Sequence, residues 1–195
     1  MQASLAATDL ACRRGDRVLF AGVDFTLAGG EALHVTGPNG IGKSSLLRLC
    51  AGLLRPFAGG TRAEGKVGLV DERPALDPEL PLARALGFWA GCDGIVPAIL
   101  HGACERMGIG TLGDVPVRYL STGQKKRAAL ARLVGQGAAV WLLDEPLNGL
   151  DQAGLALVEE LVGEHCTGGG IALIASHQPI VLPGGRTLAL EDFAA

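Results

Sequence analysis

"GPNGIGKS", residues 37–44, is the stretch that decides the fold of this chain; it comprises Gly37, Pro38, Asn39, Gly40, Ile41, Gly42, Lys43 and Ser44. It fits the pattern G-x-x-x-x-G-K-[ST] between a predicted strand (ALHVTG) and a predicted helix, the context that this pattern requires. Glycines permit the tight turns with which backbone N–H groups surround a phosphate at the positive end of a helix. We therefore predict a phosphate-binding loop, continued by Ser45, in which Lys43 contacts the β- and γ-phosphates and Ser44 binds magnesium.

The rest of the chain alternates strands and helices around this loop. The first thirty or so residues alternate apolar and polar side chains around turns, which predicts short antiparallel strands. A helix follows the loop until Pro56, and residues 66–70 form a strand. Glycine and proline break residues 72–137 into helical segments, which we interpret as an inserted helical subdomain. A strand (AAVWLLDEP), a helix from Asp151 to about Glu164 and a strand (GIALIAS) then complete the chain.

This order of elements predicts an α/β P-loop NTPase with a mainly parallel core sheet, an N-terminal antiparallel β subdomain and right-handed crossovers. At 195 residues we expect one domain spanning residues 1–195. The 48% hydrophobic content with 30 glycines is typical of an aliphatic, turn-rich protein. A net charge of -3 argues against a nucleic-acid partner held by bulk charge.

The five cysteines form no Cys-x-x-Cys pair, which favours buried, reduced thiols in a reducing compartment. We find no apolar run of the roughly 18–20 residues that a membrane-spanning helix needs. The N-terminus has no basic start followed by an apolar block. We expect a cytosolic chain whose membrane role comes through a partner.

Polar side chains follow two of the predicted buried strands. Asp144 and Glu145 end the first, where ligands bind in open α/β sheets. Asp144 is positioned to hold magnesium, and Glu145 to accept a proton from an attacking water. His177 follows the next strand, and a neutral imidazole there can hydrogen-bond phosphate or orient water. A solvated loop residue is the alternative for His177.

A second polar segment, YLSTGQKKRAALARL (Tyr119–Leu133), combines Ser121, Thr122 and Gly123 with a basic helix pattern. It has the composition of another anion site at a helix N-terminus. The KKR at residues 125–127 is interpreted as a solvated helix face, with the alternative that one of its charges holds phosphate.

Together these motifs resemble the ATP-binding cassette (ABC) ATPases: the phosphate loop, the signature LSTGQ at residues 120–124, WLLDE, NGLD at residues 148–151 and His177, in that order. The resemblance implies ATP and Mg²⁺ as cofactors, and a homodimer in which each ATP lies between one chain's phosphate loop and the other chain's signature. It assigns Glu145 as general base, His177 as the histidine at the γ-phosphate, and Asp151 as a link between protomers. Ser121, Gly123 and Gln124 then contact the partner's nucleotide.

Within that family, the signature region, Trp141 and SHQP at residues 176–179 resemble the ATP-binding subunits of the haem exporter of cytochrome c biogenesis, the CcmA type. This implies integral-membrane transporter subunits as partners and a place on the cytoplasmic face of the cell membrane. Another small ABC transporter or a soluble ABC ATPase remains the alternative. The guanine-reading motif Asn-Lys-x-Asp of GTPases is absent, as is a Cys-x-x-Cys-His haem attachment, so we expect no direct haem binding.

Three positions depart from the family pattern. Arg13 or Arg14 stands where an aromatic residue usually stacks on adenine, and arginine can also stack on a base. The switch glutamine is missing, with Glu72 or Arg73 nearest to its place. Thr122 replaces the first signature glycine, so we expect Gly123 to take any unusual backbone conformation.

Overall fold

The computed structural model describes residues 3–182 and 184–195. Within them, a three-stranded antiparallel sheet has the order β2 (Arg17–Ala28), β1 (Ser4–Arg14), β4 (Ala58–Glu64). A five-stranded parallel sheet has the order β5 (Val67–Val70), β6 (Val140–Asp144), β7 (Ile171–Ala175), β3 (Ala32–Thr36), β8 (Arg186–Ala189) within the same residues. The helices are α1 (Lys43–Cys50), α2 (Leu82–Asp93), α3 (Pro97–Arg106), α4 (Thr122–Gly135) and α5 (Gln152–Thr167), with short 3₁₀ turns η1 (Gly110–Leu112), η2 (Val117–Tyr119) and η3 (Leu190–Phe193).

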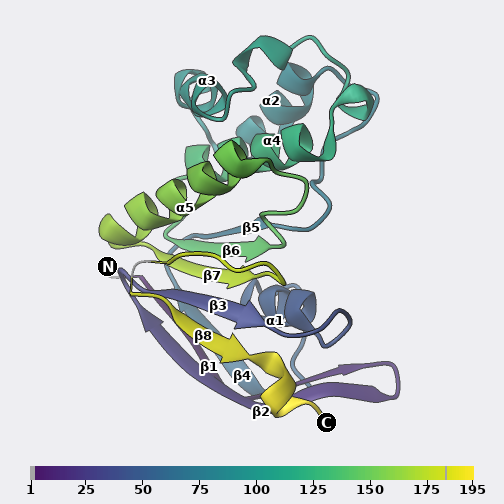
Figure 1. The fold of residues 1–195 in the computed structure, drawn as a ribbon, viewed down its shortest axis with the longest axis vertical. Helices are drawn as coiled ribbons and strands as arrows, with labels where there is room; N and C mark the ends of the chain where they lie inside the picture. The colour runs from purple at the N-terminus through teal and green to yellow at the C-terminus, as the bar shows by residue number, and fades with distance from the viewer. Residues whose placement is uncertain (1–2, 183) are drawn as a thin grey trace.

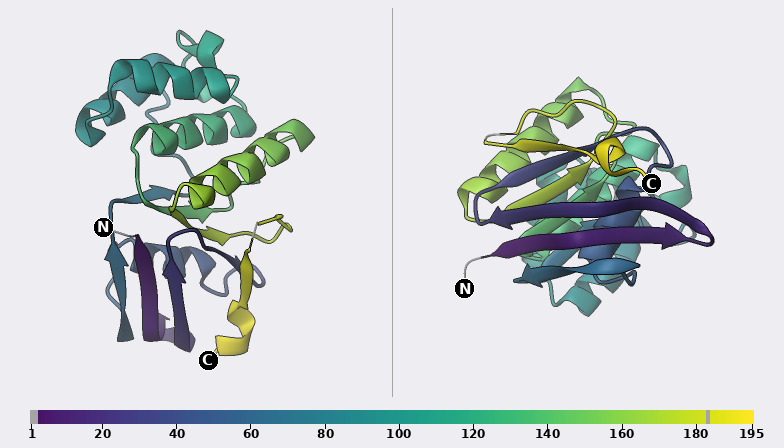
Figure 2. Two further views of the ribbon diagram at one scale, coloured as in Figure 1. Left: turned by 90° about the vertical axis from the view of Figure 1, so that its left-hand side faces the viewer. Right: turned by 90° about the horizontal axis from the view of Figure 1, so that it is seen from below.

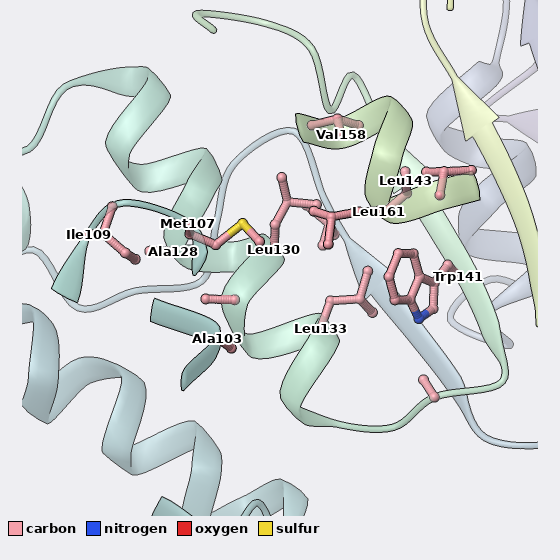
Figure 3. Packing of buried hydrophobic residues seen from close by; sticks show 14 of the residues in the cluster. Ala103, Met107, Ile109, Ala128, Leu130, Leu133, Trp141, Leu143, Val158 and Leu161 are labelled. Atoms are coloured by element: carbon pink, nitrogen blue, oxygen red, sulfur yellow. The ribbon is translucent and has the colours of Figure 1, made fainter. Parts of the chain in front are cut away.

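The parallel sheet is covered on both faces, which explains why its central strands are apolar throughout. Trp141 and Leu143 of β6 pack with α4 and α5, whereas Val140 and Leu142 pack with α1 and the antiparallel sheet. Successive residues of a strand point to opposite faces, so each face receives alternate side chains. Figure 1 shows these layers in order, and Figure 3 shows Trp141 and Leu143 beside Leu133 of α4 and Leu161 of α5.

The helical segments α2, α3 and α4 lie between β5 and β6 in the chain, at the opposite end of the molecule from the antiparallel strands (Figure 2). Helices α3 and α4 pack closely, and their contacts include Ala103, Met107, Ala128 and Leu130 of one apolar cluster (Figure 3). The signature helix α4 therefore joins the helical region to the sheet.

Several element boundaries differ from those predicted. The helix after the phosphate loop ends at Cys50 rather than Pro56, because Gly52 adopts φ 72° and the Leu53 N–H turns back to Arg48 O at 2.8 Å. The N-terminal strands are long rather than short, with 11 residues in β1 and 12 in β2.

Two strands escaped prediction altogether. β4 (AGGTRAE) is rich in glycine and largely solvent-facing, and β8 is short, so neither carries a periodic apolar signal. Cys92 is exposed, whereas buried thiols were predicted; Cys12, Cys50 and Cys166 are buried.

Candidate functional site

The phosphate loop connects β3 to α1, and its glycines are required by its geometry. Gly42 caps α1 at φ 118°, and a side chain there would place its Cβ 3.0 Å from the Phe20 ring. Lys43 is buried, and its Nζ donates to Gly37 O at 2.7 Å and to Pro38 O at 3.3 Å. The loop therefore folds around its own lysine, which fixes a positive charge at its centre.

Two acidic side chains and a histidine come to the same edge of the sheet, because β6, β7 and β3 are adjacent and parallel. Asp144 pairs with Ala175, and Val35 pairs with Ala175 on the other side. The carboxyl ends of all three strands therefore meet at the phosphate loop.

Glu145 is held in a strained backbone conformation, with φ 46°. Non-glycine residues adopt this region at a cost and are enriched at functional sites. Its N–H donates to Ala175 O at 2.8 Å, its Oε1 lies 3.9 Å from Lys43 Nζ, and its Oε2 lies 2.8 Å from His177 Nδ1. Because an ionised carboxylate only accepts, the His177 Nδ1 proton donates to Glu145. The side chains of Glu145, Lys43 and His177 thus converge.

Asp144 is 2% exposed, and its Oδ1 is buried without a hydrogen-bond partner among the described residues. Burial raises the pKa of this carboxyl above its usual value, although the Ser44 side chain and Arg48 act in the opposite direction. An unpaired buried carboxylate oxygen beside a serine hydroxyl suits a hard divalent cation such as Mg²⁺. Within residues 3–182 and 184–195, no group of three or more His, Cys, Asp or Glu side chains is arranged to hold a metal ion. Mg²⁺ needs none, since it keeps several waters and binds through one or two protein ligands and phosphate.

Lys43, Ser44, Glu145 and His177 lie around one cavity of about 470 Å³, which is also lined by Arg14, Leu19, Asn39, Gly40, Gly42, Ser45, Glu72 and Asn148. The predicted site residues Gly37, Pro38, Ile41 and Asp144 do not line it. Arg14, rather than Arg13, lines it; the Arg13 guanidinium instead lies 4.6 Å above the Phe57 ring. Glu72 lines it as well, whereas Arg73 lines a different cavity with Trp89. Leu19 was missed, since an apolar residue of an N-terminal strand carries no chemical signal.

The signature residues begin α4. Ser121 and Gln124 form a reciprocal cap, in which Gln124 N donates to Ser121 Oγ at 3.2 Å and Ser121 N to Gln124 Oε1 at 2.9 Å. Gly123 has an ordinary helical backbone, so it takes no unusual conformation. It is needed for space instead, because a Cβ would lie 2.5 Å from Gly149 O. The methyl group of Thr122 packs against Gly149.

A second cavity, of about 330 Å³, lies at the signature and is lined by Gly108, Ile109, Ser121, Gly123, Gln124, Arg127, Gly149, Leu150 and Asp151. Asp151 caps α5 by accepting from Gly154 N, and it accepts from Arg127 Nη2 at 2.9 Å. Among the described residues, the two cavities share no lining residue. One chain therefore presents a phosphate loop and a signature at two separate places.

Lys126 and Arg127, two of the three basic residues after the signature, are not part of a solvated helix face. Lys126 is 1% exposed, and its Nζ lies 3.2–3.4 Å from the carbonyl oxygens of Asp71, Glu72 and Asp144. Arg127 pairs with Asp151, as described above.

A phosphate loop, a strand-end pair of carboxylates and a following histidine on neighbouring parallel strands define a P-loop nucleotide-binding protein. Residues 20–148 match the family described as ABC transporter. Curated relatives include the cytochrome c biogenesis ATP-binding export proteins CcmA of Novosphingobium aromaticivorans, 53% identical over 98% of both chains, and of Zymomonas mobilis, 50% identical over 99% of this chain and 87% of the relative. The chain belongs to the ABC transporter ATP-binding family, and within it to the CcmA type.

Solved structures share the fold. An inward-facing putative metal-chelate type ABC transporter has a TM-score of 0.82 at 23% identity, covering 98% of this chain and 81% of the other. A putative ABC transporter ATP-binding protein from Pyrococcus furiosus has a TM-score of 0.84 at 22% identity, covering 98% and 100%. As an ABC ATPase, the chain binds and hydrolyses ATP. Across the residues described, no helix has the length and apolar character to cross a membrane.

Proposed function

We propose that this chain is the ATP-hydrolysing subunit of a membrane ABC transporter, the haem export system of cytochrome c maturation. The names of its CcmA relatives support the assignment. The observation that carries the hydrolytic part is the convergence of Lys43, Glu145 and His177, with Lys43 Nζ 3.9 Å and His177 Nδ1 2.8 Å from the two carboxylate oxygens of Glu145.

In the proposed reaction, the backbone N–H groups of residues 37–45 and the amine of Lys43 bind the β- and γ-phosphates. Ser44 and Asp144 would hold Mg²⁺, which would neutralise charge on those phosphates. Glu145 accepts the proton of the water that attacks the γ-phosphate. His177 keeps the Glu145 carboxylate in place through Nδ1. Glu72 takes the position of the family's switch glutamine, because it lines the cavity beside Ser44 and Glu145.

Residues 1–195 form a single nucleotide-binding domain in this proposal, with residues 72–137 as its helical subdomain, and the working unit is a homodimer. Supporting this, the signature cavity and the phosphate cavity lie apart in one chain. In a head-to-tail dimer, Ser121, Gly123 and Gln124 face the γ-phosphate held by the partner, with the positive end of α4 directed at it. Asp151 lies at the same interface.

The proposed membrane partners are integral-membrane transporter subunits, which hold the chain at the cytoplasmic face of the cell membrane. Their docking surface is the cavity of about 400 Å³ between β5, the segment that follows it and α4, where Trp89, Arg73 and Leu53 lie. Leu53 is 64% exposed and Phe88, next to Trp89, is 63% exposed. Exposed apolar side chains beside a groove are typical of a protein–protein interface.

Two measurements test the proposal. Purified chain should hydrolyse ATP, and a Lys43→Ala variant should bind ATP more weakly by about tenfold or more, since it loses a charge-assisted contact with phosphate. In detergent-solubilised membranes, the chain should co-purify with integral-membrane subunits that also bind haem. Co-purification with a different transporter would assign the chain to that transporter. A chain that stays in the soluble fraction would favour the soluble ABC ATPase.

A further inference from the structure

Lys126 is a buried cation outside the cavity that holds the nucleotide. It lies on α4, five residues beyond Ser121, and is 1% exposed. A buried ammonium is costly unless its three protons find acceptors. Here the acceptors are Asp71 O at 3.4 Å, Glu72 O at 3.2 Å and Asp144 O at 3.3 Å.

These three carbonyls belong to the ends of two neighbouring strands. Asp71 and Glu72 directly follow β5, and Asp144 ends β6; Val70 pairs with Leu143 in the parallel register. Glu72 reaches the nucleotide cavity, and Asp144 precedes Glu145. The side chain of Lys126 thus bonds the backbone at or next to both cavity carboxylates, Glu72 and Glu145.

The turn at residues 71–72 is also bonded to α1, the helix that follows the phosphate loop. Arg48 of α1 donates from Nη2 to Asp71 Oδ1 at 2.8 Å and to Oδ2 at 2.9 Å. Asp71 Oδ1 also accepts from Glu72 N at 2.8 Å. The turn at residues 71–72 is therefore bonded to both helices. Arg48 of α1 bonds the Asp71 carboxylate, and Lys126 of α4 bonds the two backbone carbonyls.

We propose that Lys126 is a positioning residue for ATP hydrolysis, which transmits the position of the signature helix to Glu72 and Glu145 while Arg48 anchors the same turn to the phosphate-loop helix. The inference rests on the proposed function of the cavity. This chain has no glutamine at the turn, and the turn is instead clamped by two basic side chains from the helices that begin at the phosphate loop and at the signature. Small displacements of catalytic groups lower turnover by up to about a hundredfold.

The decisive variant is Lys126→Met, which keeps the apolar stem and removes the amine, with Lys125→Met on the same helix as the control. Lys126→Met should lower kcat by about tenfold or more while KM and the dissociation constant for ATP stay within about threefold of wild type. Lys126→Arg, which keeps the charge and the donors, should recover part of kcat. Lys125→Met should leave all three values unchanged.

A coupling measurement separates positioning from simple destabilisation. If Lys126 acts through the side chain of Glu72, Lys126→Met should lower kcat by a much smaller factor in a Glu72→Ala background than in wild type, because the side chain that Lys126 positions is then already absent. A purely structural role predicts that Lys126→Met lowers the urea midpoint by the same amount in both backgrounds. The kcat of the folded fraction would then be unchanged.

Arg48→Met releases the same turn from the α1 side and should lower kcat in the same way. Because the side chains of Arg48 and Asp71 are 34% and 33% exposed, we expect the fold to tolerate the loss of this pair. It therefore decides the question if Lys126→Met does not fold. Wild-type kcat in either folded variant overturns the inference. Absence of ATP hydrolysis by the wild-type chain would instead refute the proposed function, so the two failures are distinguishable.

Discussion

Glu145 Oε2 lies 2.8 Å from His177 Nδ1, across the ends of the adjacent parallel strands β6 and β7. The contact joins residues 32 positions apart, and the main-chain N–H of His177 lies 3.4 Å from the same oxygen. The other carboxylate oxygen, Oε1, is 3.9 Å from Lys43 Nζ. Glu145 is thereby held between the histidine and the phosphate loop.

The first prediction concerns this carboxylate. Glu145→Gln keeps the size of the side chain and removes the base, so turnover should fall by roughly 10² or more while ATP still binds. Single-turnover hydrolysis and equilibrium nucleotide binding measure the two effects separately. Hydrolysis at the wild-type rate would exclude Glu145 as the base.

A second prediction concerns the shared site. Ser121→Asp keeps a good helix cap but sets a negative charge toward the partner's γ-phosphate, so hydrolysis should fall about tenfold or more with little loss of stability. Melting temperature and ATPase rate are the measurements.

Mixing Ser121→Asp chains with Lys43→Ala chains extends this test. In a head-to-tail mixed dimer, one of the two sites joins an intact phosphate loop to an intact signature, so activity should return. Two affinity tags isolate the mixed dimer. A site formed within a single chain predicts no recovery above the two parent variants.

The third prediction concerns Asp144, whose Oδ1 is buried and unpaired among the described residues. Asp144→Asn should raise the Mg²⁺ concentration for half-maximal hydrolysis by about 10–100-fold. Because burial raises the pKa of this carboxyl, its ionised form is penalised in the metal-free protein, and the asparagine variant should melt at a higher temperature at neutral pH. Asp192→Asn, at an exposed position, is the control. An unchanged Mg²⁺ dependence contradicts the role.

The fourth prediction is a pH dependence of stability. Burial lowers the pKa of His165, against the opposing hydrogen bond to Ile171 O, and its ring stacks on Trp141 with centroids 3.9 Å apart. With the folded pKa below the unfolded value of about 6.5, the unfolded chain binds the proton more readily. The contribution of neutral His165 to the free energy of unfolding is therefore complete above about pH 6.5, and it is lost as the pH falls through the folded pKa.

Urea unfolding of wild type and His165→Phe between pH 8 and 5 checks this. The variant should lose up to about 1.4 kcal/mol less stability per pH unit in the acidic part of the range. His101→Gln, at an exposed position, should follow wild type. Parallel curves for wild type and His165→Phe would rule out the linkage.

Much of the site could be predicted because its motifs are local. The phosphate loop and the Asp144–Glu145 pair each lie at the end of a strongly apolar strand, so their place at the edge of a parallel sheet followed from these apolar runs and from the order of strands and helices. Element boundaries were less predictable: Gly52 ended α1 before Pro56 could, and β4 has no alternation to reveal it.

The sequence by itself determined the fold class and the family, and it supplied the residues that we propose bear the chemistry, since these depend on short spacings along the chain. Tertiary structure decided which of two neighbouring residues faces the nucleotide cavity, selecting Arg14 over Arg13 and Glu72 over Arg73. It also buried Lys126 against Asp71, 55 positions away. No local pattern distinguishes that lysine from a solvated one, because its burial depends on two strand ends that only the folded sheet brings together.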